Sequence, residues 1–181
     1  MSAERAAFEI LELHGGEEVL EDLREILFDA VSGGFSIGFL EQISAVEADA
    51  FWTGLLEDLG PNRRMWVARS KGSNGRVLGT VQFERCVKPN GRHRAEVQKL
   101  LVHSKARGLG LGRRLMETLE AAASADGIRL LFLDTFEGSG AERMYAHLGW
   151  QRAGVLPDYA AAPDGALGAT VLFYRLLDGV R

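Results

Sequence analysis

The chain has 181 residues, of which 46% are hydrophobic and 25% are charged, and its formal net charge is −4. This balance is typical of globular proteins, argues against global disorder, and gives no basic surface for nucleic acid. A single cysteine excludes an internal disulfide, and with no long apolar run or leader-like N-terminus we expect one cytoplasmic domain over residues 1–181 without a membrane segment.

The first third of the sequence predicts one strand and two helices. A short strand is expected near Phe8–Leu13. Apolar residues at helical spacing predict a helix over about Glu17–Val31, which ends at Ser32-Gly33-Gly34. A second helix is expected over about Ser44–Leu59, and it ends at Gly60-Pro61.

Three strands follow, and short turn-rich connections favour their antiparallel pairing. The strands are expected at Met65–Arg69, Val77–Glu84 and Ala95–His103. The connections are Lys71–Gly75 and Lys88–Gly91, both rich in turn-forming residues.

The remainder of the chain alternates between helices and strands. In chain order the expected elements are a helix at Arg113–Ala125, a strand at Ile128–Leu133, a helix at Gly140–Leu148, and strands at Trp150–Val155 and Ala169–Leu177. A long loop over Leu156–Gly168 is expected between the last two strands. The β-α-β unit indicates one parallel strand pair in a mixed α/β sheet, with the order β-α-α-β-β-β-α-β-α-β-β.

A glycine-rich turn, Arg107-Gly108-Leu109-Gly110-Leu111-Gly112, lies between a strand and the start of a helix. Glycines let the backbone approach a ligand closely, and a helix N-terminus offers free N–H groups with a partial positive charge. The turn therefore predicts an anion cradle, most naturally for a pyrophosphate. Its G-x-G-x-G spacing departs from the dinucleotide fingerprint G-x-G-x-x-G, and no Lys-Ser/Thr pair follows, which excludes a P-loop.

The turn and the strand before it, Leu100-Leu101-Val102, resemble the acetyl-CoA signature of the GNAT superfamily of N-acetyltransferases. A second segment, Ala141–Trp150, is similar to that family's A-x-x-x-Y-x-x-x-G-aromatic pattern. The expected element order also resembles the GNAT acyl-CoA N-acyltransferase fold. Four shorter segments look like the tabtoxin-resistance acetyltransferase group: Pro89–Gly91, Arg94–Lys99, Leu133–Thr135 and Pro163–Gly165.

The resemblance implies acetyl-CoA as co-substrate. It implies that the backbone around the turn holds the cofactor, with contacts from Leu100, Leu101, Val102, Arg107, Gly108, Leu109, Gly110, Leu111 and Gly112. Arg113 is expected to reach a CoA phosphate. Where the family often has asparagine this chain has Gly138, and Ser139 is expected to replace that contact. No metal is expected, because the histidines lack metal-ligand spacing with a cysteine or acid cluster.

Acyl transfer to an amine needs a base for the ammonium and an acid for the departing thiolate. Tyr145 stands at the family's usual acid position. Two carboxylates compete as the base: Glu96 begins the strand that leads into the signature, and Asp134 is expected at the C-terminal end of the next strand. Desolvation there would raise the pKa of Asp134. The sequence does not rank the two.

The implied reaction is acetyl transfer to a primary amine of a small molecule, and the subgroup resemblance implies an amino-acid-like toxin or antibiotic as the acceptor. A non-catalytic CoA-binding sensor is the alternative. The acceptor is expected to meet three loops, Gly33–Phe35, Pro89–Asn90 and Tyr159–Gly165. No nucleic-acid or membrane partner is expected, and a homodimer is compatible with such a fold.

Overall fold

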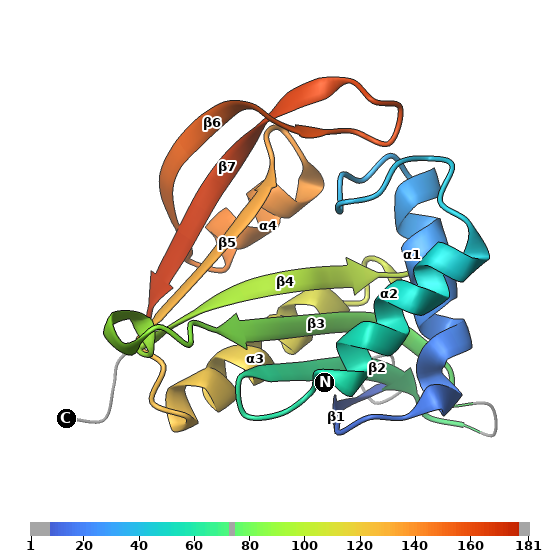
Figure 1. Ribbon diagram of the computed structural model, residues 1–181, viewed down its shortest axis with the longest axis horizontal. Coiled ribbons are helices and arrows are strands. Elements are labelled where there is room, and N and C mark those ends of the chain that lie inside the picture. Colours follow the sequence, from blue (N-terminus) through green and yellow to red (C-terminus); the bar gives the residue numbers. More distant parts are fainter. Residues whose placement is uncertain (1–7, 73–74, 178–181) are drawn as a thin grey trace.

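The computed structural model describes residues 8–72 and 75–177, which build a seven-stranded sheet with helices on both faces (Figure 1). The strands are β1 (Phe8–Leu13), β2 (Arg63–Ser70), β3 (Val77–Arg85), β4 (Arg94–Val102), β5 (Leu130–Phe136), β6 (Gln151–Ala161) and β7 (Leu167–Leu176). The helices are α1 (Leu20–Ser32), α2 (Ala45–Glu57), α3 (Leu111–Ala125) and α4 (Gly140–His147). This confirms the predicted element order and the mixed α/β class.

The sheet has the strand order β1-β2-β3-β4-β5-β7-β6, and its only parallel pair among the described strands is β4 with β5. That pair is short, since Arg94–Glu96 on β4 meets Leu130–Phe132 on β5 and the ladder then stops. Beyond it the two strands diverge (Figure 1). The predicted parallel pair is therefore confirmed, and it opens toward the C-terminal ends of both strands.

Two apolar layers hold the helices to the sheet. One layer joins α1 and α2 to the face that carries Met65, Val67 and Leu101. The other joins α3 and α4 to the opposite face, with Phe83 and Phe173 among its buried residues. Within the described chain, none of the helices has the length and apolar character needed to cross a membrane.

Helix α2 begins where the sequence predicts, because Ser44 forms a complete capping box. The Ser44 hydroxyl accepts from the Glu47 N–H at 3.2 Å, and the Glu47 carboxylate accepts from the Ser44 N–H at 2.9 Å. Such a box satisfies two backbone donors that the first turn would leave unpaired. It fixes the end of the α1–α2 loop.

The predicted long loop over Leu156–Gly168 is wrong. β6 continues to Ala161 and β7 already begins at Leu167, with a tight turn between them that the Ala162 N–H closes on the Ala166 carbonyl at 2.8 Å. β6 is an edge strand whose register shifts between Leu156 and Ala160. Proline and a bulge are typical of edge strands, and they remove the alternation by which a strand is recognised in sequence.

Candidate functional site

A β-bulge lies at the point where β4 leaves β5. Thr80 on β3 faces Leu101 and Gln82 faces Gln98, so two residues of β4, Lys99 and Leu100, lie opposite a single residue of β3. Lys99 has a φ of 52°, in the left-handed region that side chains other than glycine rarely adopt. A bulge bends and twists its strand, which accounts for the early end of the β4–β5 ladder.

The glycine turn after β4 forms a cradle of unpaired N–H groups. Gly108 and Gly110 have φ values of 81° and 76°, and Gly110 is the N-cap of α3. Within residues 8–72 and 75–177, no acceptor takes a hydrogen bond from the N–H groups of residues 108–113. Successive free N–H groups at a helix N-terminus are a site for an anion. The cradle therefore fits the pyrophosphate that its sequence predicts.

The side chains at the start of α3 differ in whether they can contact a ligand in the cradle. Leu111 is buried in the α3 core, so only its backbone is available to a ligand. The half-exposed Arg113 lies 3.7 Å from Glu117 and is within reach of the cradle's solvent side. Arg114 instead donates to the Phe8 carbonyl at 3.0 Å, toward β1.

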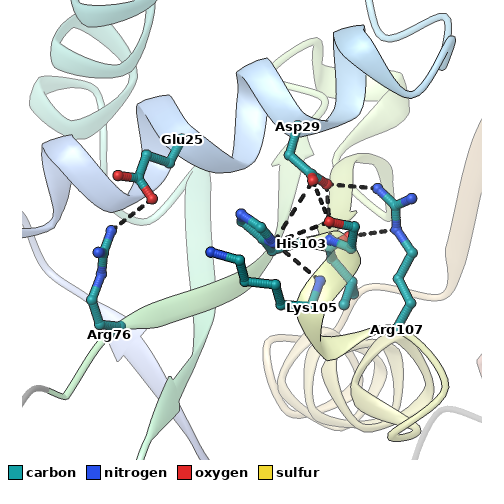
Figure 2. A network of polar contacts seen from close by, with 8 residues as sticks. Glu25, Asp29, Arg76, His103, Lys105 and Arg107 are labelled. Carbon is teal, nitrogen blue, oxygen red and sulfur yellow. Dashed lines mark hydrogen bonds and ion pairs between the residues drawn. The ribbon is translucent and has the colours of Figure 1, made fainter.

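An aspartate of α1 holds the cradle from the other side. Asp29 accepts hydrogen bonds from the Ser104 N–H at 2.8 Å, from the Ser104 hydroxyl, and from Nη2 of Arg107 at 2.8 Å (Figure 2). The Arg107 side chain also donates from Nε to the Val102 carbonyl at 3.0 Å and lies 4.8 Å above the Phe35 ring. Arg107 thus links α1, the end of β4 and the α1–α2 loop.

Asp29 is charged in this network. Burial by itself raises the pKa of the Asp29 carboxyl, but the hydrogen bonds from Ser104, with the charges of His103 and Arg107, outweigh burial and lower the pKa. The sequence analysis missed Asp29, because a carboxylate at the end of an amphipathic helix looks like an ordinary solvated residue.

Two carboxylates lie together on the face of the sheet that carries α1 and α2. Ala95, Val97 and Leu133, which flank the two carboxylates, are buried in the α3 core. Alternation along the strands therefore places Glu96 and Asp134 on the opposite face. The expectation that Asp134 ends its strand is wrong, since β5 continues to Phe136. Asp134 instead projects from within the strand, beyond the last β4–β5 pair, and is solvent-accessible.

Both carboxyls have raised pKa values. For Glu96 the main cause is burial, which Gln98 opposes by hydrogen bonding and which the negative charges of Asp134 and Glu84 reinforce. For Asp134 burial is again the main cause, and the charge of Lys99 opposes it. Either group exchanges a proton closer to neutrality than an ordinary carboxyl does.

Two glutamines support Glu96 from β3 and β4. Gln82 is buried and donates from Nε2 to Oε1 of Gln98 at 3.0 Å, and Gln98 in turn hydrogen-bonds with Glu96. This chain of amides links Glu96 to β3. The sequence analysis missed both glutamines, which stand in strands at positions where apolar residues are usual.

Tyr145 approaches the carboxylates from the opposite layer. Its ring is 6% exposed and packs 6.0 Å from the rings of Trp150 and Phe173. Burial raises the pKa of its hydroxyl, and the negative charge of Asp134 raises it further. The hydroxyl forms no hydrogen bond with any described residue, so it keeps its proton and has no protein acceptor for it.

Lys99 is the most informative residue that the sequence analysis left without a role. Its Nζ donates to the Ile37 carbonyl at 2.6 Å and lies 5.5 and 5.3 Å from the ring centroids of Phe39 and Phe51. The adjacent polar pair Gln98-Lys99 interrupts the two-residue alternation of the strand, and that interruption was the available signal of a bulge.

Ser139, which was predicted to contact the cofactor, is also the N-cap of helix α4. Its hydroxyl accepts from the Glu142 N–H at 3.1 Å as the N-cap of α4, and it lies 3.3 Å from the Thr135 hydroxyl. These contacts place Ser139 just after the end of β5, with its hydroxyl already used in helix capping.

Two of the three loops expected to meet the acceptor come together. The Ser36 hydroxyl donates to the Ala161 carbonyl at 2.8 Å, and the Glu41 N–H donates to the Pro163 carbonyl at 3.0 Å. The α1–α2 loop and the β6–β7 turn therefore touch on the side where β4 and β5 diverge (Figure 1). The third loop, at Pro89–Asn90, lies at the opposite end of β4 and is not part of this arrangement.

Comparisons with known proteins agree with this geometry. The acetyltransferase (GNAT) family profile matches residues 20–150. An uncharacterised N-acetyltransferase of Azospirillum brasilense, from its hisH–hisA intergenic region, is 32% identical over 120 residues, which cover 65% of this chain and 68% of that protein.

Solved structures share the fold at lower identity. A candidate phosphinothricin N-acetyltransferase has a TM-score of 0.77 at 21% identity and covers 94% of this chain and 99% of its own. A candidate acetyltransferase from Salmonella typhimurium, solved with its cofactor acetyl-CoA, has a TM-score of 0.73 at 19% identity, with 96% of each chain covered.

Proposed function

Since this chain belongs to the acetyltransferase (GNAT) family, we propose that it transfers the acetyl group of acetyl-CoA to a primary amine of a small, amino-acid-like molecule. The donor assignment rests on the N–H groups of residues 108–113, which have no acceptor among the described residues. They follow β4, a strand whose pairing with β5 has already ended. Acetyl-CoA supplies a pyrophosphate for the cradle and an activated thioester. Its pantetheine amides suit the unpaired edge of β4 in the manner of an added strand.

Two proton transfers accompany the reaction, one to a carboxylate and one from Tyr145. Glu96 or Asp134 takes the proton from the acceptor's ammonium, either directly or through a water, so that the amine is free to attack. Tyr145 donates its hydroxyl proton to the departing sulfur. The raised pKa values of the two carboxyls suit proton acceptors, and the raised pKa of Tyr145 keeps its hydroxyl protonated until the thiolate departs.

The acceptor class and the physiological role are inferred from likenesses to other acetyltransferases. The likeness to a candidate phosphinothricin N-acetyltransferase, together with the resemblance of four short segments to the tabtoxin-resistance group, supports an amino-acid-like toxin or antibiotic and a role in detoxification. Membership of the tabtoxin-resistance group itself stays a prediction, as do a cytoplasmic location and a homodimer.

The proposed function is tested by an acceptor screen. Purified protein and acetyl-CoA are incubated with amino acids, amino-acid amides, polyamines, aminoglycosides and peptides with a free N-terminus, and free CoA thiol is measured. We expect turnover with small amines that resemble amino acids. Turnover only with peptides would contradict the small-molecule acceptor, and acetyl-CoA binding without turnover on any amine would favour the sensor.

Asp29→Asn is expected to weaken acetyl-CoA binding about tenfold, with little change in kcat at saturating acetyl-CoA. Hydrogen bonds to charged groups contribute about 1.5–3 kcal/mol, and about 1.4 kcal/mol corresponds to tenfold in affinity. Asparagine still accepts from Ser104 but loses the ion pair with Arg107, so residues 104–107 hold the cradle less firmly. Isothermal titration and the KM for acetyl-CoA measure the effect.

Glu25→Gln is the matched control, because Glu25 stands one turn earlier on α1 and pairs with Arg76 at 2.8 Å instead of with the cradle (Figure 2). It should leave acetyl-CoA affinity unchanged. An equal loss of acetyl-CoA affinity in both variants would mean that Asp29 affects binding only through the stability of the fold.

A further inference from the structure

Lys99 is held in an uncommon conformation at the centre of the candidate site. It and Asp158 are the non-glycine residues with positive φ in the described chain. A left-handed residue other than glycine costs on the order of 1–2 kcal/mol and persists where its surroundings fix it, often at functional positions. In Lys99 that conformation turns the side chain toward the α1–α2 loop, where Nζ reaches the Ile37 carbonyl.

The ammonium of Lys99 is positioned but not neutralised. Among the described residues no carboxylate lies within 4.0 Å of Nζ, and its hydrogen bond to Ile37 uses one of three donors. Phe39 and Phe51 lie beside it as aromatic walls. Such contacts hold a cation in place without removing its charge.

Burial lowers the pKa of Lys99, and the negative charges of Asp134 on β5 and of Glu96 on its own strand oppose that shift. Glu84 lies next to Glu96 on β3, as its direct cross-strand partner. The face therefore presents a cluster of negative groups beside one positive group. A ligand that complements it carries an ammonium for the carboxylates and, a short distance away, an anion for Lys99.

We propose that the Lys99 ammonium binds the carboxylate of a zwitterionic, amino-acid-like acceptor while the acceptor's amine faces Glu96 and Asp134. This specificity role rests on the proposed acetyltransferase function. A charge-assisted hydrogen bond of this kind selects for the charged partner, because an uncharged analogue leaves the half-buried cation without a counter-charge.

The test compares acceptors with and without that anion, in the wild type and in variants of Lys99. L-amino acids and the corresponding L-amino-acid amides are assayed with acetyl-CoA, and kcat/KM is measured for the wild type and for Lys99→Met. In the wild type we expect the acids to be preferred over the amides by about 10- to 100-fold. Lys99→Met should lose that preference by lowering kcat/KM for the acids much more than for the amides, and Lys99→Arg should retain part of it.

Ser36→Ala is the matched control for loop position, because it removes the bond from the same loop to Ala161 without changing the charge of the site. It should affect acids and amides equally. Lys99 would have a purely structural role if Lys99→Met lowered kcat/KM for acids and amides equally, or if the wild type did not prefer acids. Either result overturns the proposal and leaves the acetyltransferase assignment intact, whereas absence of turnover on every amine would overturn the proposed function as well.

Discussion

Tyr145→Phe is expected to lower kcat at least 100-fold while changing acetyl-CoA affinity by no more than about twofold. General acid catalysis by a positioned side chain contributes roughly 10²–10⁴-fold, and phenylalanine removes the only group at this position that can donate a proton. The ring contacts with Trp150 and Phe173 are retained, and the hydroxyl forms no hydrogen bond with a described residue, so the fold loses little. Pre-steady-state release of CoA thiol measures the chemical step.

Tyr174→Phe is the matched control, because it removes a hydroxyl that hydrogen-bonds with Gln151 on the exposed strand pair β6–β7. It should leave kcat unchanged. If Tyr145→Phe keeps the wild-type rate, the hydroxyl has no role in protonating the leaving sulfur, and Tyr145 is a core residue alone. If both kcat and acetyl-CoA affinity collapse together, its role is structural.

The sequence predicts the framework well where local signals are strong. The helix over Gly140–Leu148 and the strand near Phe8–Leu13 are found where they were predicted, because caps, glycines and alternating apolar residues mark their limits. The glycine turn is also predictable as an anion cradle, since two of its glycines adopt the positive φ that only glycine adopts readily. These features depend on a few consecutive residues.

The acceptor side is less predictable because it depends on contacts between distant residues. Lys99 acquires its position from a bulge that is defined only by the pairing of β4 with β3. Asp134 lies within β5 because Phe136 still pairs with Thr170 on β7, and a continuous apolar run does not show where such pairing stops. Asp29 meets Ser104 across 75 positions of sequence, so no local pattern indicates that contact.

Gly110→Val is expected to abolish acetyl-CoA binding without unfolding the protein. In the wild type, acetyl-CoA at 100 times its Kd should stabilise the fold by about 2.7 kcal/mol, and NAD should have no effect. Valine at a φ of 76° strains the backbone by about 2 kcal/mol, although no described atom lies within 4 Å of the new Cβ. The side chain then stands in the cradle, where the pyrophosphate must approach the backbone. Thermal unfolding with and without each ligand measures both effects.

Gly127→Val is the matched control that separates backbone strain from obstruction of the cradle. Gly127 follows the other end of α3, has a φ of 75°, and likewise has no described atom within 4 Å of an added Cβ. It should cost similar stability yet keep the full acetyl-CoA effect, because it lies far from the free N–H groups of residues 108–113. Loss of acetyl-CoA stabilisation in both variants would show that backbone strain in α3 is sufficient. Stabilisation that persists in Gly110→Val would place the cofactor elsewhere, since a pyrophosphate cannot share the cradle with a valine side chain.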